Sequence, residues 1–206
     1  MYYGQHAEDK YIIENFFLNK KNGVFLELGA MDGIKFSNTY YLEKYMGWAG
    51  VLIEPTQSLF EKLKINRPNS KCYNYIISET RNNIEFSVYN DALSMNRIKR
   101  YNYHNDANHI ISYPTKYLSE ILEDAKIKYI DFFSLDVEGA ELEVLKTMNW
   151  DIPVHIILAE IKGINIYSRE KNNECKKLLK SKGFTYHSST RTDEVWINPH
   201  YESSKK

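Results

Sequence analysis

A short apolar run that ends in a glycine turn constrains this chain more than any other feature. Val24 to Leu28 is rich in strand-forming residues, which predicts a buried parallel strand. Gly29 and Gly33 follow at once, and glycine lets the backbone turn tightly and approach a ligand closely. A strand, a glycine turn and a helix in this order are typical of the crevice in which α/β proteins bind nucleotides.

The turn leads into a predicted helix from Thr39 to at least Tyr45, with Ser37 or Asn38 as its cap. The free N–H groups at the start of this helix would face the crevice. Glu27, near the end of the strand, is expected to face a ligand. The candidate binding residues of this segment are Glu27, Gly29, Ala30, Asp32, Gly33, Ser37, Asn38 and Thr39.

A second apolar strand, Val51 to Ile53, ends in Glu54. Glu54 lies near the offset of about 20 residues at which an acidic side chain binds ribose hydroxyls. The middle glycine of the dinucleotide fingerprint is replaced by Met31, so close approach of a pyrophosphate is disfavoured and an NAD oxidoreductase is the weakest alternative. A nucleoside without a pyrophosphate, such as S-adenosylmethionine, fits this turn better.

Gly23 to Pro55, the block Ser134 to Glu141 (SLDVEGAE) and the opening Gly4 to Asp9 (GQHAED) together resemble the FkbM-type family of S-adenosylmethionine-dependent methyltransferases. The likeness covers residues 4–197, and the SLDVEGAE block is its most specific part. It implies an α/β, Rossmann-like class I methyltransferase fold: a doubly wound, mostly parallel, seven-stranded sheet with an antiparallel last strand. It also implies S-adenosylmethionine as cofactor and adds Gln5 and Ser78, the expected adenine contact, to the cofactor residues.

Acidic residues recur where the predicted strands end, and parallel strands present these ends at one edge of the sheet. Such an acidic edge suits the positive sulfonium of the cofactor. A hydroxyl acceptor needs a base or a metal, and Asp136 is the best-placed base, with Glu138 and Glu160 as further catalytic candidates. Asp136 and Glu160 are alternatively the ligands of a Mg²⁺ ion. Capping of a helix that begins at Gly139 is the purely structural alternative for Asp136 and Glu138.

The other predicted elements follow from hydrophobic periodicity and turn residues. Helices are expected over 8–17, from Thr56 to before Pro68, and over 115–124, 139–148 and 170–182; strands over 72–77, 84–89, 130–135 and 154–161; and a hairpin over 184–188 and 194–197. Residues 91–112 are polar and little patterned, which predicts either a mobile surface loop or a substrate-binding lid.

With 206 residues, the chain is expected to form a single domain over 1–206, with a helical N-terminal segment at 1–22 and a tail at 200–206. Its 27 basic and 27 acidic residues balance, which argues against a strong attraction to nucleic acid or anionic membranes. Two cysteines without zinc-binding spacing, no signal pattern and no apolar stretch long enough to span a bilayer predict a cytoplasmic protein without membrane insertion.

The expected activity is O-methylation of a small-molecule or glycan acceptor, at a sugar hydroxyl of a glycan or nucleotide sugar. Ribose 2′-O-methylation of RNA is an alternative, since Asp136, Lys162 and Glu194, with Lys10 or Lys20, match the Lys-Asp-Lys-Glu set of such enzymes. A catalytically inactive module that binds S-adenosylmethionine is a third. Intact acids at Glu54 and Asp136 argue against this third alternative.

Overall fold

The computed structural model describes residues 1–89, 95–101, 107–161 and 166–201. Seven strands in these ranges form a central sheet in the order β10-β11-β9-β8-β1-β2-β3. Its strands are β1 (Val24–Leu28), β2 (Ala49–Ile53), β3 (Lys71–Tyr73), β8 (Ile130–Leu135), β9 (Val154–Ala159), β10 (Thr185–Ser189) and β11 (Glu194–Ile197). β11 pairs antiparallel with both of its neighbours, β9 and β10, whereas every other neighbouring pair in this sheet is parallel. The predicted fold, including the antiparallel last strand, is confirmed.

Helices cover both faces of the sheet, as the apolar strands require. The helices are α1 (Glu8–Ile12), which continues into a π-helical turn (Ile13–Phe17), α2 (Tyr40–Met46), α3 (Gln57–Asn66), α4 (Leu118–Asp124), α5 (Glu141–Thr147) and α6 (Ile166–Ser181). Buried side chains of α1, α2 and α3 form the core on one face. Those of α4, α5 and α6 form the core on the other face. Every residue of β8 is buried between these two layers.

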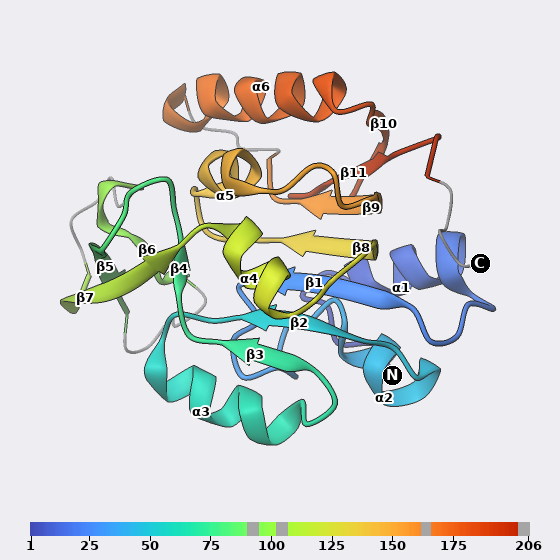
Figure 1. Ribbon diagram of the computed structural model, residues 1–206, viewed down its shortest axis with the longest axis horizontal. Coiled ribbons are helices and arrows are strands. Elements are labelled where there is room, and N and C mark those ends of the chain that lie inside the picture. The colour runs from blue at the N-terminus through green and yellow to red at the C-terminus, as the bar shows by residue number, and fades with distance from the viewer. Residues whose placement is uncertain (90–94, 102–106, 162–165, 202–206) are drawn as a thin grey trace.

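A second, smaller sheet lies at the end of the central sheet to which the parallel strands point, as the arrowheads in Figure 1 show. In the described part of the chain it contains four strands, in the order β4-β7-β5-β6. Its strands are β4 (Ile76–Ile77), β5 (Asn83–Val88), β6 (Arg97–Ile98) and β7 (His109–Lys116). This sheet therefore forms a wall beside the edge where the strand-end acids gather.

Two boundary predictions for this region are wrong. The strand expected over 72–77 is divided between the two sheets, because the side chain of Asn74 donates hydrogen bonds to the carbonyls of Glu54 and Pro55, at 2.8 and 2.7 Å. The helix expected from Thr115 starts at Leu118, because Thr115 and Lys116 pair with β4.

The expectation of an unpatterned loop over 91–112 is wrong for residues 97–101 and 109–112. The first range forms β6 and a short 3₁₀ turn (Lys99–Tyr101), and the second begins β7, which pairs with β5. Residues 109–112 are all exposed, so they lack the alternation that marks a half-buried strand. The remaining parts of this prediction, at 91–94 and 102–106, fall outside the described residues.

Two helix starts also differ from expectation. α5 begins at Glu141 rather than at Gly139, since Glu138 and Gly139 both have positive φ angles. α6 begins at Ile166, earlier than the predicted residue 170. No helix in the described ranges has the length and apolar character needed to cross a membrane.

Candidate active site

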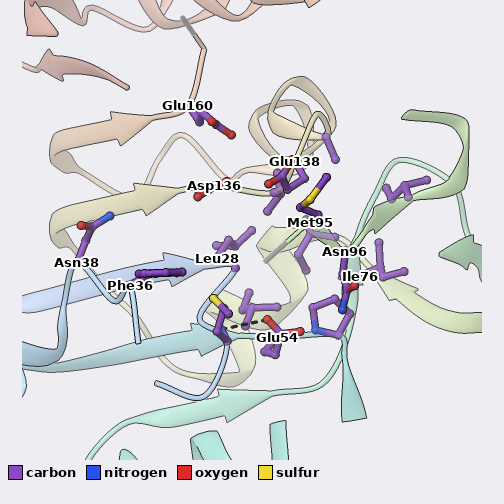
Figure 2. Close-up of a pocket in the computed structure, with 18 of the residues that line it drawn as sticks. Leu28, Phe36, Asn38, Glu54, Ile76, Met95, Asn96, Asp136, Glu138 and Glu160 are labelled. Atoms are coloured by element: carbon purple, nitrogen blue, oxygen red, sulfur yellow. Dashed lines mark hydrogen bonds between the residues drawn. The ribbon is translucent and has the colours of Figure 1, made fainter. Parts of the chain in front are cut away.

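A cavity of about 270 Å³ opens at the carboxyl ends of the parallel strands, between the central sheet and the small sheet (Figure 2). Residues from the N-terminal segment, the glycine turn, the ends of β2, β8 and β9, the small sheet and the β10–β11 turn line it. The sequence-predicted residues that line it are Gln5, Gly29, Asn38, Glu54, Asp136, Glu138 and Glu160. The chain thus brings together candidates that are far apart in the sequence.

The glycine turn is fixed against the neighbouring strands. The N–H groups of Gly29 and Ala30 both donate to the carbonyl of Ile53, at 3.1 and 3.2 Å. Gly29 has φ +77°, and a Cβ built on it would lie 2.0 Å from the carbonyl oxygen of Asp136. Only glycine fits this position, because it adopts positive φ without strain and allows the close approach.

Glu54 lies at the end of β2 and is only 4% exposed. Its carboxylate accepts hydrogen bonds from the backbone N–H groups of Met31 and Thr56, at 3.0 and 2.8 Å. Burial raises its pKa, while these backbone hydrogen bonds oppose the increase. Each carboxylate oxygen can accept a second hydrogen bond, so Glu54 keeps capacity for a ligand hydroxyl in the cavity.

Glu27 does not face the cavity, contrary to expectation. It is buried below the turn, where its carboxylate accepts hydrogen bonds from the side chains of Ser37 and Thr39, at 2.8 and 2.6 Å, and from the N–H of Asn38, at 2.7 Å. Ser37 and Thr39 are likewise buried and do not line the cavity. These three residues shape the turn from beneath, and the expectation that they contact the ligand is not supported by their positions.

Arg67, which sequence reasoning missed, completes this buried network. Its guanidinium bonds to Glu43 at 2.8 Å, to the carbonyl of Gly33 at 3.0 Å and to the Thr39 hydroxyl at 2.9 Å, and lies 3.7 Å from Glu27. No local pattern around the end of α3 marks this arginine, because all its partners come from other segments.

Four other predicted cofactor residues also lie outside the cavity lining. Asp32 accepts hydrogen bonds from the N–H groups of Ile34 and Lys35, at 2.9 and 2.8 Å, and so stabilises the turn itself. The buried hydroxyl of Ser78 donates to Glu143 at 2.5 Å. Ala30 and Gly33 belong to the turn but are absent from the lining.

One end of the cavity is apolar, and sequence reasoning did not identify it as part of the site. Ile76 and Ile77 of β4, Phe86 of β5, Ile98 of β6 and Ala140 line this end. Ile76, Phe86, Ile98 and Ala140 also belong to one packed cluster. The alternation over 84–89 predicted the strand that carries Phe86. That Phe86 faces this cavity depends on the pairing of β5 with β6 and β7, which the alternation does not encode.

Three carboxylates meet on the opposite side of the cavity from Glu54 (Figure 2). Asp136 follows β8 and Glu160 follows β9, and the pairing of Leu135 with Ala159 brings these strand ends together. Asp136, Glu138 and Glu160 each place one oxygen within 4.8 Å of the others. Arg97 of β6 forms an ion pair with Glu138 at 2.8 Å, whereas no ion pair of the described residues includes Asp136 or Glu160.

The crowding of these acids changes how they titrate. Burial and the negative charge of Glu138 raise the pKa of Glu160 to about 8. The side chain of Asp136 is exposed to the cavity, and the walls of the cavity surround it with protein. Desolvation, and after it the negative charge of Glu160, raises the pKa of Asp136 well above the usual range. A proton shared by two adjacent carboxylates is the expected state near neutral pH.

Helix capping does not account for these acids. The residue before α5 is Ala140, and the N–H of Gly139 donates to Glu141 at 2.9 Å. In the described residues no side-chain cap is formed at this helix start.

The structure excludes one member of the alternative set for RNA methylation. Lys20 forms an ion pair at 2.5 Å with Asp131, near the start of β8, whereas Asp136 lies just past its other end. Glu194 is paired with Lys176 at 2.6 Å. Lys10 is exposed on α1, and Lys162 falls outside the described residues. Lys20 is therefore excluded as the first lysine of that set.

Three features define a class I S-adenosylmethionine-dependent methyltransferase: the strand order, the antiparallel β11, and the glycine turn beside Glu54 at the end of β2. The methyltransferase FkbM domain matches residues 27–186, so the chain belongs to the FkbM methyltransferase family. No curated protein matches the sequence.

Solved structures with a similar fold include other methyltransferases. Aeropyrum pernix fibrillarin, in complex with natively bound S-adenosyl-L-methionine, is 13% identical, with a TM-score of 0.49 over 86% of this chain and 66% of its own. Precorrin-6y C5,15-methyltransferase from Geobacter metallireducens is 9% identical, with a TM-score of 0.49 over 92% of this chain and 85% of its own.

Proposed function

We propose that the enzyme transfers a methyl group from S-adenosylmethionine to a sugar hydroxyl of a glycan or nucleotide sugar. The observation that carries the proposal is the Asp136–Glu160 carboxylate pair in the same cavity as the glycine turn. A sugar hydroxyl is a weak nucleophile and requires a base close to the methyl donor.

The lining of the cavity supports one orientation of the cofactor. The ribose hydroxyls would bind Glu54, and adenine would occupy the apolar end between the two sheets. The methionine part would follow Gly29 and Asn38. This orientation brings the sulfonium towards Asp136, whose carbonyl oxygen abuts Gly29.

In this arrangement the acceptor oxygen attacks the methyl carbon as the carbon–sulfur bond breaks, giving a methyl ether and S-adenosylhomocysteine. The proton of the hydroxyl passes to the Asp136–Glu160 pair. Positioning supplies most of the acceleration in such an in-line displacement. Since the pKa of Glu160 is about 8, the rate should rise with pH, reach half of its maximum near pH 8 and level off above that pH.

A second form of the proposal gives the same carboxylates a metal. Oxygen ligands suit Mg²⁺, and Asp136 and Glu160 would supply two of them while waters complete the shell. The ion would lower the pKa of the acceptor hydroxyl in place of a free base. Incubation with EDTA distinguishes the two forms: chelation stops a metal-dependent reaction and added Mg²⁺ restores it, whereas a carboxylate base is insensitive.

The test is methyl transfer from labelled S-adenosylmethionine to a panel of free sugars, nucleotide sugars, oligosaccharides and short RNAs. The proposal predicts label in a methyl ether of a free sugar, a nucleotide sugar or an oligosaccharide. Label only in RNA ribose would contradict the sugar acceptor, and binding of S-adenosylhomocysteine without transfer to any acceptor would favour an inactive binding module. Glu61→Gln is the control variant, because Glu61 lies exposed on α3 and does not line the cavity.

A further inference from the structure

The cavity holds more negative charge than its expected cofactor can balance. Five carboxylates line it without an ion pair to lysine or arginine among the described residues: Glu8, Glu54, Asp136, Glu160 and Asp193. S-adenosylmethionine carries a sulfonium, an ammonium and a carboxylate, which leaves one net positive charge. Even with one proton shared by two of the acids, the occupied cavity would retain unbalanced negative charge, which is costly in a low-dielectric site.

Glu8 is the most informative of these acids. Its side chain is only 3% exposed, and its Oε2 accepts a hydrogen bond from the N–H of His6 at 2.7 Å. Its Oε1 is buried and has no hydrogen-bond partner in the structure. A buried carboxylate oxygen without a partner is rare in folded proteins, because its desolvation is not compensated. Since Glu8 lines the cavity, a bound ligand can supply the missing donor.

Asp193 extends the same acidic region. It lies in the β10–β11 turn, is 8% exposed, and its Oδ2 accepts hydrogen bonds from Thr190 and Thr192, at 3.1 and 3.2 Å. Desolvation and then the negative charge of Glu8 raise its pKa. Asp193 in turn raises the pKa of both Asp136 and Glu160, so these acids share one electrostatic environment.

The sheet order places this region on the acceptor side. Glu54 follows β2, whereas Asp193 precedes β11, and β1, β8 and β9 lie between them. The expected ribose and methionine sites are at β1 and β2. Asp193 therefore lies beyond the carboxylate pair as seen from Glu54, in the half of the cavity left for the acceptor. Glu8 lines the same cavity, and its charge raises the pKa of Asp193, so the two acids act on the same region.

We propose that Glu8 and Asp193 bind a protonated amino group of the acceptor, which makes an amino sugar the preferred substrate class. This inference rests on the proposed function and specifies its acceptor. An ammonium group supplies three donors and a positive charge, as the unpartnered Glu8 and the charge imbalance require. A metal fits less well at this position, because the three-carboxylate group with metal-like spacing among the described residues excludes Glu8 and Asp193.

The test compares D-glucosamine with its neutral counterparts D-glucose and N-acetyl-D-glucosamine. Binding to the protein saturated with S-adenosylhomocysteine is followed by protein NMR, which measures weak affinities directly. Glucosamine should bind about tenfold more tightly than either neutral sugar, the order expected for a charge-assisted hydrogen bond. Glu8→Gln and Asp193→Asn should each remove most of this preference and leave the affinity for S-adenosylhomocysteine within about twofold, while Glu61→Gln changes neither.

The outcomes separate this inference from the proposed function. Equal binding of all three sugars, or a preference that survives Glu8→Gln, would overturn the amino-group site and leave a sugar acceptor in place. Loss of S-adenosylhomocysteine affinity in Glu8→Gln, with the glucosamine preference unchanged, would assign Glu8 to the cofactor and also overturn the inference. Binding of n-butylamine as tightly as glucosamine, with no binding of neutral sugars, would keep the cation site and contradict the sugar. If none of these compounds binds, the amino-group site is overturned, whereas the glycan or nucleotide-sugar acceptor is judged separately by the methyl-transfer panel.

Discussion

The backbone of Gly29 lies directly against the carbonyl oxygen of Asp136, so that a Cβ on Gly29 would come within 2.0 Å of that oxygen. This contact joins the turn expected to hold the cofactor to the strand end that carries the proposed base. Any side chain at Gly29 would separate the two strand ends and move Asp136 relative to the bound cofactor.

Gly29→Ala should therefore destabilise the fold and abolish binding of S-adenosylhomocysteine. Gly183→Ala is the matched control, since Gly183 also has positive φ, +87°, but has no atom within 4 Å of the added Cβ. The control should lose about 1–2 kcal/mol of unfolding free energy, which is the conformational cost of positive φ for alanine. Gly29→Ala should lose clearly more, because its Cβ also meets the carbonyl oxygen of Asp136. Urea unfolding and calorimetry measure both effects, and equal losses in the two variants would show that the close approach is unimportant.

Arg67→Met should cost about 3–5 kcal/mol of unfolding free energy, because it leaves Glu27 and Glu43 buried without their cation. Arg81→Met is the control: its ion pair with Glu120 is exposed and screened by solvent, so its loss should change the unfolding free energy little. Denaturant titration of both variants tests the assignment of Glu27 to the support of the turn. A similar, small loss in both would contradict it.

The raised pKa of Glu160 predicts how stability depends on pH. Its folded-state pKa of about 8 exceeds the ordinary value of 4.5, so the folded state binds the proton more tightly. The stability contribution is complete below pH 4.5 and is lost as pH rises through 8. Between pH 5 and pH 9 the wild type should lose more stability than Glu160→Gln, by about 1–3 kcal/mol after allowance for solvent screening.

Thermal unfolding in a series of buffers measures this difference. Glu61→Gln should keep the pH dependence of the wild type, because Glu61 is exposed and outside the cavity. Identical pH profiles for the wild type and Glu160→Gln would show that Glu160 is not the group whose proton is retained.

Glu54→Gln should weaken binding of S-adenosylhomocysteine by about 1.5–3 kcal/mol, the range for hydrogen bonds to a charged group. The amide of the variant has one acceptor oxygen in place of the two that Met31 and Thr56 use. The unfolding free energy should therefore fall as well, by less than the binding free energy does. Calorimetry on the folded variant separates the two effects. An unchanged dissociation constant would remove Glu54 from the cofactor site.

Much of the fold was predictable, because it depends on local patterns. Runs such as Ile130 to Leu135 identify buried strands, and the meeting of Asp136 with Glu160 follows from the parallel order of such strands. The exposed start of β7 lacks that pattern. Arg67 and Glu8 were missed for another reason: their roles depend on partners or a cavity formed by distant segments, and no sequence spacing encodes this.

The central claim is that the Asp136 carboxylate acts on the acceptor beside the bound cofactor. Asp136→Asn keeps the shape of the side chain and removes its basicity. Turnover on the sugar that the wild type methylates should fall by about 10²–10⁴, the usual contribution of a positioned base, while the dissociation constant of S-adenosylhomocysteine stays within about twofold. Full activity in Asp136→Asn, or a loss of cofactor affinity as large as the loss of turnover, would contradict the account.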